Sequence, residues 1–144
     1  MDFGLVNWGW YFLAQQAPFP ERVIGADPDA FYFRHDRVFD PEALNDYLRC
    51  VRKDEAIHAM CEDYRAGATY DFAADEADRG KQRIACPVLA LWSSRGELER
   101  WFDVLDVWRQ WAVDVRGRPI DCGHYLAEEA PEEIAELFIE FFSA

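Results

Sequence analysis

The spacing of apolar residues divides this sequence into two regions with different periodicities. In residues 1–80, apolar side chains recur every three or four positions, as they do along one face of a helix. The two clearest stripes consist of Leu44, Tyr47, Leu48 and Val51, and of Ile57, Met60, Cys61 and Tyr64. No convincing strand is visible in this region, so we expect it to form helices and loops.

Prolines and polar stretches mark where these helices start and stop. Pro18 and Pro20 interrupt the aromatic N-terminal stretch, because proline lacks a backbone N–H donor and restricts its neighbour. Asp40 followed by Pro41 is a typical helix start, with a capping carboxylate before a first-turn proline. The polar residues 71–83 are expected to form a connection to the second region.

From Ile84 onward the pattern changes to strand, helix, strand and helix. Residues 87–92 and 113–121 are typical of strands, and residues 103–111 between them have helical spacing. This order predicts a parallel β-α-β unit. The strand at 87–92 is apolar on both faces, as expected of a parallel strand that helices cover.

A final helix is expected to start near Pro131. The apolar residues that it is expected to bury are Ile134, Leu137, Phe138, Phe141 and Phe142. The acidic residues near its start are Glu128, Glu129, Glu132 and Glu133. We interpret them as solvated carboxylates that compensate the helix dipole rather than as a cation site, and we expect no metal.

His124 is the strongest candidate for a catalytic residue. It follows the second predicted strand, at the carboxyl end where open α/β sheets keep reactive groups. A histidine late in the chain fits the α/β-hydrolase order of nucleophile, acid and histidine. Residues 1–123 contain no G-x-S-x-G and no glycine-flanked Asp or Cys that could form a nucleophile elbow. We therefore expect the back half of an enzyme.

Composition and charge narrow the function classes. With 51% hydrophobic, 16% aromatic and 30% charged residues, the chain can form a core and lacks a disorder signature. The net charge of −13 argues against nucleic acid or an anionic membrane as partner, because both require a basic surface. Residues 1–10 carry no positively charged leader, and their apolar run is too short to span a bilayer.

The four cysteines indicate neither a zinc site nor a disulfide framework. They are Cys50, Cys61, Cys86 and Cys122, and no pair has C-x-x-C spacing. We expect reduced, mostly buried thiols, which suit a cytoplasmic protein. No cofactor is expected.

Several sequence blocks resemble one known family, in the same order. They are Trp8-Gly9-Trp10-Tyr11-Phe12-Leu13-Ala14-Gln15, Met60-Cys61-Glu62-Asp63-Tyr64-Arg65-Ala66-Gly67-Ala68, Leu89-Ala90-Leu91-Trp92, Asp106-Val107-Trp108-Arg109 and Gly123-His124-Tyr125-Leu126-Ala127-Glu128-Glu129-Ala130-Pro131. The second and last blocks are the most specific. Together the blocks resemble the haloacetate (fluoroacetate) dehalogenases over essentially the whole chain.

The resemblance implies the C-terminal part of an α/β-hydrolase fold, with an incomplete sheet. Residues 1–82 match the helical cap, and residues 83–144 match the last two strands and helices of the core. Members of this family displace halide with an aspartate, and a histidine-activated water then cleaves the resulting ester. His124 matches that histidine, and Trp10 and Tyr64 match cap residues that donate hydrogen bonds to the departing halide. The implied substrate is a small haloacetate-like molecule.

Some family features are replaced or missing. Where the family has a histidine before the cap tryptophan, this chain has Gly9, which removes one donor and bears on selectivity for fluoride. No acid follows the strand at 87–92, in agreement with the family, whose acid lies earlier. The nucleophile, that acid and the arginines that hold the substrate carboxylate are expected to precede Met1.

Two other functions remain open. An epoxide hydrolase of the same fold would use a cap tyrosine, here Tyr64, to protonate the opening ring oxygen. Alternatively, the chain is a non-catalytic module that uses the cap surface for binding, or a gene remnant without activity. Whatever the function, we expect self-association, aggregation or dependence on an N-terminal half, because an unpaired apolar edge at strand 87–92 would recruit another chain.

The remaining titratable candidates have structural interpretations. His35 and His58 lie in polar surroundings and are expected to face solvent. Asp114 and Asp121 flank the last strand and are taken as structural. Trp10 and Tyr64 also lie on aromatic or apolar stripes, where such residues usually belong to a core.

Overall fold

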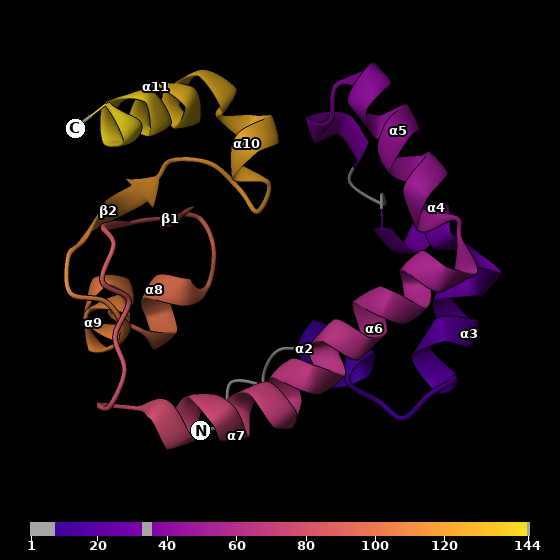
Figure 1. Cartoon of the computed structure of the whole chain (residues 1–144). Helices are drawn as coiled ribbons and strands as arrows, with labels where there is room; N and C mark the ends of the chain where they lie inside the picture. Colours follow the sequence, from indigo (N-terminus) through magenta and orange to yellow (C-terminus); the bar gives the residue numbers. More distant parts are fainter. Residues whose placement is uncertain (1–7, 33–35, 144) are drawn as a thin grey trace. The chain divides into compact units, whose positions relative to one another are not determined.

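The computed structural model describes residues 8–32 and 36–143, which Figure 1 shows. The chain divides into two compact units, Met1–Ala77 and Asp78–Ala144, each with its own core. His35 and residues 1–7, which some of the sequence expectations concern, lie outside the described residues. Within the described ranges, no helix combines the length and the apolar character that crossing a membrane requires.

The first unit is built from helices. They are α2 (Trp8–Leu13), α3 (Phe19–Ala26), α4 (Pro28–Tyr32), α5 (Pro41–Val51), α6 (Asp54–Ala68) and α7 (Tyr70–Asp78), with the 3-10 turn η1 at Asp36–Val38. The described residues of this unit form no strand. This confirms the prediction of helices and loops.

Local sequence signals set the starts of these helices as predicted. Asp40 caps α5, because its Oδ1 accepts hydrogen bonds from the backbone N–H groups of Glu42 at 2.8 Å and Ala43 at 3.3 Å. These bonds satisfy two of the donors that every helix start leaves unpaired. The break predicted at Pro18 lies between α2 and α3, and Pro20 stands in the first turn of α3.

Helix α6 provides the core of the first unit. Its buried residues Ile57 and Cys61 pack with Phe12, Leu13 and Ile24 of α2 and α3. Partly buried residues around this cluster are Phe31, Tyr32, Met60 and Tyr64. The predicted stripe on α6 therefore faces the core, whereas the stripe on α5 contains no fully buried residue.

The polar segment after α6 is mostly a helix and not the plain connection that was expected. α7 spans Tyr70–Asp78, and every one of its residues is exposed. Alanine and glutamate favour a helix here, and Asp71 suits its first turn. Because α7 buries nothing, its sequence has no strong apolar stripe that would reveal it.

The second unit is a parallel β-α-β unit followed by two helices. Its elements are β1 (Val88–Ser93), α8 (Leu98–Trp101), α9 (Val104–Trp111), β2 (Val115–Ile120), α10 (Leu126–Glu129) and α11 (Pro131–Phe142). β1 and β2 pair in parallel, from Val88 opposite Val115 to Ser93 opposite Ile120. The predicted strand order and parallel direction are confirmed.

Helices cover both faces of this two-stranded sheet. Leu91 and Ile120 pack with Ile134 of α11, whereas Trp92 donates its Nε1–H to Glu99 of α8 at 2.9 Å. Figure 1 shows α11 on one side of the strands and α8 and α9 on the other. This layering confirms the α/β fold class and explains why the first strand is apolar on both faces.

Helix α11 begins where predicted but buries fewer residues than expected. Ile134 is buried, and Leu137 and Phe141 are partly buried. Phe138 is 47% exposed and Phe142 is 79% exposed, so the expectation of burial is wrong for these two. The apolar stripe of α11 is therefore wider than the face of the helix that packs against the strands of this unit.

The cysteines are free, but only two are buried. Cys61 lies in the first core and Cys122 in the second, whereas Cys50 and Cys86 are exposed. Burial raises the pKa of both the Cys61 and the Cys122 thiols, which keeps them protonated. The expectation of mostly buried thiols therefore holds for half of them.

Candidate functional site

His124 lies at the carboxyl end of β2, in the loop that leads to α10. Its side chain is exposed, and its ring meets the ring of Tyr125 edge to face at a centroid distance of 5.1 Å. The position agrees with the prediction that His124 follows a parallel strand. An exposed imidazole at this end of a sheet can reach a water molecule or a substrate.

Two side chains hold the backbone of this loop, and the sequence interpretation identified neither. Ser93, buried at the end of β1, donates its Oγ–H to the carbonyl oxygen of Cys122 at 2.7 Å. Glu129 of α10 accepts hydrogen bonds from the backbone N–H groups of Gly123 at 2.7 Å and Tyr125 at 3.0 Å. The residues on both sides of His124 are thereby fixed.

The acidic residues around the start of α11 are not all solvated. Glu129 binds loop amides, and Glu133 pairs with Arg118 at 2.8 Å. The interpretation as solvated carboxylates is wrong for Glu129, because the amides of Gly123 and Tyr125, just before α10, donate hydrogen bonds to its carboxylate. One sequence feature could have indicated this role: Glu129 follows the start of a helix closely enough for its carboxylate to reach back to the N-cap amide.

Asp121, at the end of β2, is occupied by an ion pair. Its Oδ1 accepts a hydrogen bond from Arg95 Nε at 2.9 Å, and this bond holds the pKa of the carboxyl below its usual value. Both side chains are mostly exposed, so the pair contributes little to stability. The geometry agrees with a structural reading of Asp121.

Trp10 and Tyr64, 54 positions apart in the sequence, lie together in the first unit. Their rings meet edge to face, with centroids 4.9 Å apart. Gly67, one turn after Tyr64, makes room for the tryptophan, because a Cβ atom there would lie 3.2 Å from the Trp10 ring. Trp10 is 37% exposed, so this pair lies at the edge of the core and not inside it.

Tyr32 is a further polar ring of this unit, in the neighbourhood of Tyr64, that the sequence interpretation missed. It packs against the same core as Tyr64, and its hydroxyl donates to the sulfur of Met60 at 3.0 Å. Burial, with smaller effects of Cys61 and Tyr64, raises the pKa of Tyr32 to about 12. Tyr32 therefore remains a neutral donor at physiological pH.

A cluster of charged groups on α3 and α6 is an ion-pair network. Donor atoms of Glu21, His58 and Glu62 lie within 4.8 Å of one another, a spacing that could hold a metal ion. Arg65 already binds both carboxylates, Glu21 at 2.8 Å and Glu62 at 2.5 Å, and neutralises much of their charge. A cation would have to displace this guanidinium. His58 is mostly exposed, as predicted, and also contacts Glu21.

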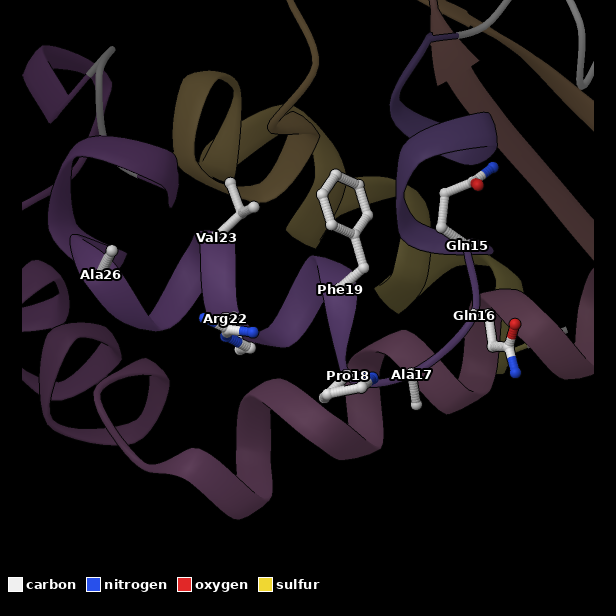
Figure 2. A pocket seen from close by; sticks show the side chains of 8 residues that line it. All are labelled: Gln15, Gln16, Ala17, Pro18, Phe19, Arg22, Val23 and Ala26. Atoms are coloured by element: carbon white, nitrogen blue, oxygen red, sulfur yellow. The ribbon is translucent and has the colours of Figure 1, made fainter.

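An open groove of about 810 Å³ is lined by the loop that follows α2 and by residues along the length of α3. Figure 2 shows Phe19 and Val23 projecting on the same side of α3, and both side chains are about half exposed. Arg22 is the charged residue among those that line the groove. The lining includes neither Trp10 nor Tyr64, so this groove is separate from the predicted halide-binding pair.

Comparison with known proteins finds several relatives, among them α/β hydrolases. No family model matches the chain. The chain is 41% identical to fluoroacetate dehalogenase from a Burkholderia species, over 94% of this chain and 47% of that protein. A candidate α/β hydrolase from Nostoc sp PCC 7120 is 44% identical, with a TM-score of 0.88, over 99% of this chain and 52% of that one. A candidate epoxide hydrolase from Pseudomonas aeruginosa is 39% identical, with a TM-score of 0.87, over 98% of this chain and 50% of that one.

Each similarity covers a larger share of this chain than of the relative. In each case the similarity covers nearly all of this chain. The chain spans about half the length of the proteins that it matches.

Proposed function

Because this chain belongs to the haloacetate dehalogenase family of α/β hydrolases, we propose that it carries the histidine base and two halide-binding side chains of an enzyme that hydrolyses carbon–halogen bonds. The proposed substrate class is a small halogenated acid such as haloacetate. The observation that supports this most is the 41% identity to a fluoroacetate dehalogenase along nearly the whole chain. An exposed His124 at the carboxyl end of β2 agrees with it.

The proposed reaction is a hydrolysis in two steps. An aspartate oxygen attacks the carbon that bears the halogen, so that a C–O bond forms, the carbon–halogen bond breaks, and halide leaves with the bonding electrons. His124 then takes a proton from water, and the hydroxide attacks the ester carbonyl. This releases glycolate and the free aspartate, and the proton passes to solvent. Haloacetate and water thus become glycolate, halide and a proton.

The aspartate and its supporting groups have no match in these 144 residues, which contain no strand-to-helix elbow with a glycine-flanked Asp. We therefore assign the nucleophile to the half of the relatives that this chain does not match. Residues 1–82 are assigned to the cap and residues 83–144 to the end of the core. The four free thiols support a cytoplasmic location, where thiols stay reduced.

Trp10 and Tyr64 are proposed to bind the departing halide. An indole N–H and a phenol O–H on neighbouring rings are suitable donors, because preorganised donors stabilise charge that develops on a leaving atom. Gly9 precedes Trp10 and offers no side-chain donor. Fluoride, the poorest leaving group, depends most on such donors, so this chain is expected to favour chloride.

Reconstitution provides the test. The 144-residue chain alone is expected to release no halide from chloroacetate or fluoroacetate, because a general base acts only on an ester that a nucleophile has formed. Co-expression with the unmatched half of the Burkholderia dehalogenase is expected to restore release. Trp10→Phe and Tyr64→Phe should each raise the activation free energy of halide release by about 1.5 to 3 kcal/mol, the value of a hydrogen bond to a charged group.

Tyr70→Phe serves as the matched control, because Tyr70 is a 76% exposed ring of α7 outside the proposed site. Equal activity in the Trp10 and Tyr64 variants and in this control would remove the halide-binding assignment. If the reconstituted wild-type protein releases no halide, the proposed function is wrong.

An epoxide hydrolase is the second candidate. The 39% identity to a candidate epoxide hydrolase favours it, and a cap tyrosine such as Tyr64 could protonate the opening ring oxygen. Hydration of a small epoxide by the reconstituted enzyme, without halide release from haloacetates, would select this function.

A further inference from the structure

Glu129 holds the two residues that flank His124. Its Oε2 accepts the Gly123 N–H at 2.7 Å, and its Oε1 accepts the Tyr125 N–H at 3.0 Å. Both carboxylate oxygens are thus used, one on each side of the proposed base. The chemistry proposed above needs neither bond directly.

The space around Gly123 is shaped for this carboxylate. A Cβ atom on Gly123 would lie 2.6 Å from Oε2 and 2.7 Å from Oε1 of Glu129, closer than real Cβ contacts. Only glycine at this position lets the carboxylate approach the loop without a shift. Gly123 and Glu129 therefore form one arrangement that depends on both residues.

Helix capping accounts for one of the two bonds. Tyr125 is the N-cap of α10, and a carboxylate that reaches back to the N-cap amide resembles half of a capping box. The bond to Gly123 lies two residues before the N-cap and satisfies no donor of the helix. What this second bond fixes is the loop backbone on the far side of His124.

We propose that Glu129 is a positioning residue for His124, fixing the backbone from which the imidazole projects in the orientation needed to activate water. The inference rests on the proposed function for the identity of that step. A general base must lie within hydrogen-bonding reach of the water that it deprotonates. A displacement of about 1 Å can reduce the rate on the order of a hundredfold.

Hydrogen exchange of the 144-residue chain tests the contact itself. Glu129→Ala should speed exchange of the Gly123 and Tyr125 amides about tenfold or more, while the amides of β2 keep their wild-type rates. Glu129→Gln retains one carbonyl acceptor and should give an intermediate effect. Glu132→Ala, which removes an exposed carboxylate of α11, is the matched control and should leave the loop unchanged. Unchanged loop exchange in Glu129→Ala would overturn the proposal.

The opposite side of the contact gives a second test. Gly123→Ala should displace the carboxylate and speed exchange of the Tyr125 amide much as Glu129→Ala does. In the Glu129→Ala background the same change should add little, because the carboxylate oxygens that the new methyl group would meet are gone. Fully additive effects would show that the two residues act separately and would contradict a shared arrangement.

Single-turnover kinetics of the reconstituted enzyme separate positioning from stability. Glu129→Ala should slow ester hydrolysis about tenfold to a hundredfold and leave KM and the rate of ester formation unchanged. A purely structural role would lower the rates of ester formation and ester hydrolysis alike, in proportion to the folded fraction. That result would overturn the proposal. If wild-type enzyme forms no ester, the proposed function fails, and the exchange experiments still decide whether Glu129 holds the loop.

Discussion

At the scale of single residues, the first unit depends on an ion pair that is largely out of solvent. The side chains of Glu21 and Arg65 are only 14% and 15% exposed, and their atoms lie 2.8 Å apart. Burial alone would raise the pKa of Glu21, but hydrogen bonds from its own backbone, Arg65 and His58 outweigh it and bring the pKa below the ordinary 4.5. The folded state therefore favours the ionised carboxylate.

This lowered pKa predicts that the first unit loses stability in acid. Because the folded pKa lies below the unfolded one, the contribution of Glu21 is complete above the unfolded pKa and is lost as pH falls through the folded value. Glu21→Gln should cost about 2 kcal/mol at pH 7 and should flatten the loss of stability below about pH 5. Urea unfolding at a series of pH values measures both effects.

Glu62→Gln is the matched control, because Glu62 binds the same Arg65 but is 52% exposed. Its effect at pH 7 should be within about 1 kcal/mol, as for exposed ion pairs. A Glu21 variant with the same pH profile as wild type would show that the pair does not stabilise the fold.

The sequence pointed to the residues proposed for the site, which remain predictions, but not to the side chains that hold the loop around His124. His124 could be placed because it follows a recognisable strand, and Trp10 and Tyr64 because their blocks resemble those of one family. Glu129 could not be singled out among four neighbouring carboxylates, because only the path of the loop brings amides to it. Ser93 was missed for the same reason, since its partner is a backbone carbonyl 29 residues away.

At the scale of elements, the sequence predicted those with a buried stripe or a clear cap. α6, α9, β1 and β2 each carry one of these signals. α9, β1 and β2 form close to their predicted bounds, and α6 contains its predicted stripe. α7 has neither a buried stripe nor a side-chain cap, so its sequence predicts only a polar connection. The outer side of α11 was predicted to be buried because a sequence shows which residues are apolar, but not which elements cover them.

The cap of α5 provides a test at this scale. Asp40→Ala should destabilise the chain by about 1 kcal/mol, because two backbone N–H groups lose their acceptor. Asp46→Ala removes a carboxylate of the same helix that forms an exposed pair with Arg49, and should cost less than about 0.5 kcal/mol. Denaturant unfolding of both variants gives the comparison, and equal effects would mean that the cap does not stabilise α5.

At the scale of the whole molecule, the second unit exposes surface that a larger fold could cover. Among the described residues, β1 pairs with β2 alone, which leaves its other edge without a strand. Large apolar side chains are also exposed on its helices, including Trp101, Trp108, Phe138, Ile139 and Phe142. An unpaired strand beside exposed apolar groups recruits other chains.

We therefore expect the 144-residue chain to self-associate when it is alone. Sedimentation velocity should show assemblies that grow with concentration, and co-expression with the unmatched half of a relative should replace them with a one-to-one complex. A monodisperse, cooperatively unfolding monomer at all concentrations would show that the chain closes its own sheet edge.

The role of His124 as the base is tested most directly by trapping the ester with His124→Asn in the reconstituted enzyme. Because the base is needed only after halide has left, the variant should release one halide per site from chloroacetate and then stop. Mass spectrometry should find one carboxymethyl group on a peptide that carries the nucleophilic aspartate. Continued turnover without any adduct, or loss of the first halide as well as of turnover, would contradict the role of His124 as the base that hydrolyses the ester.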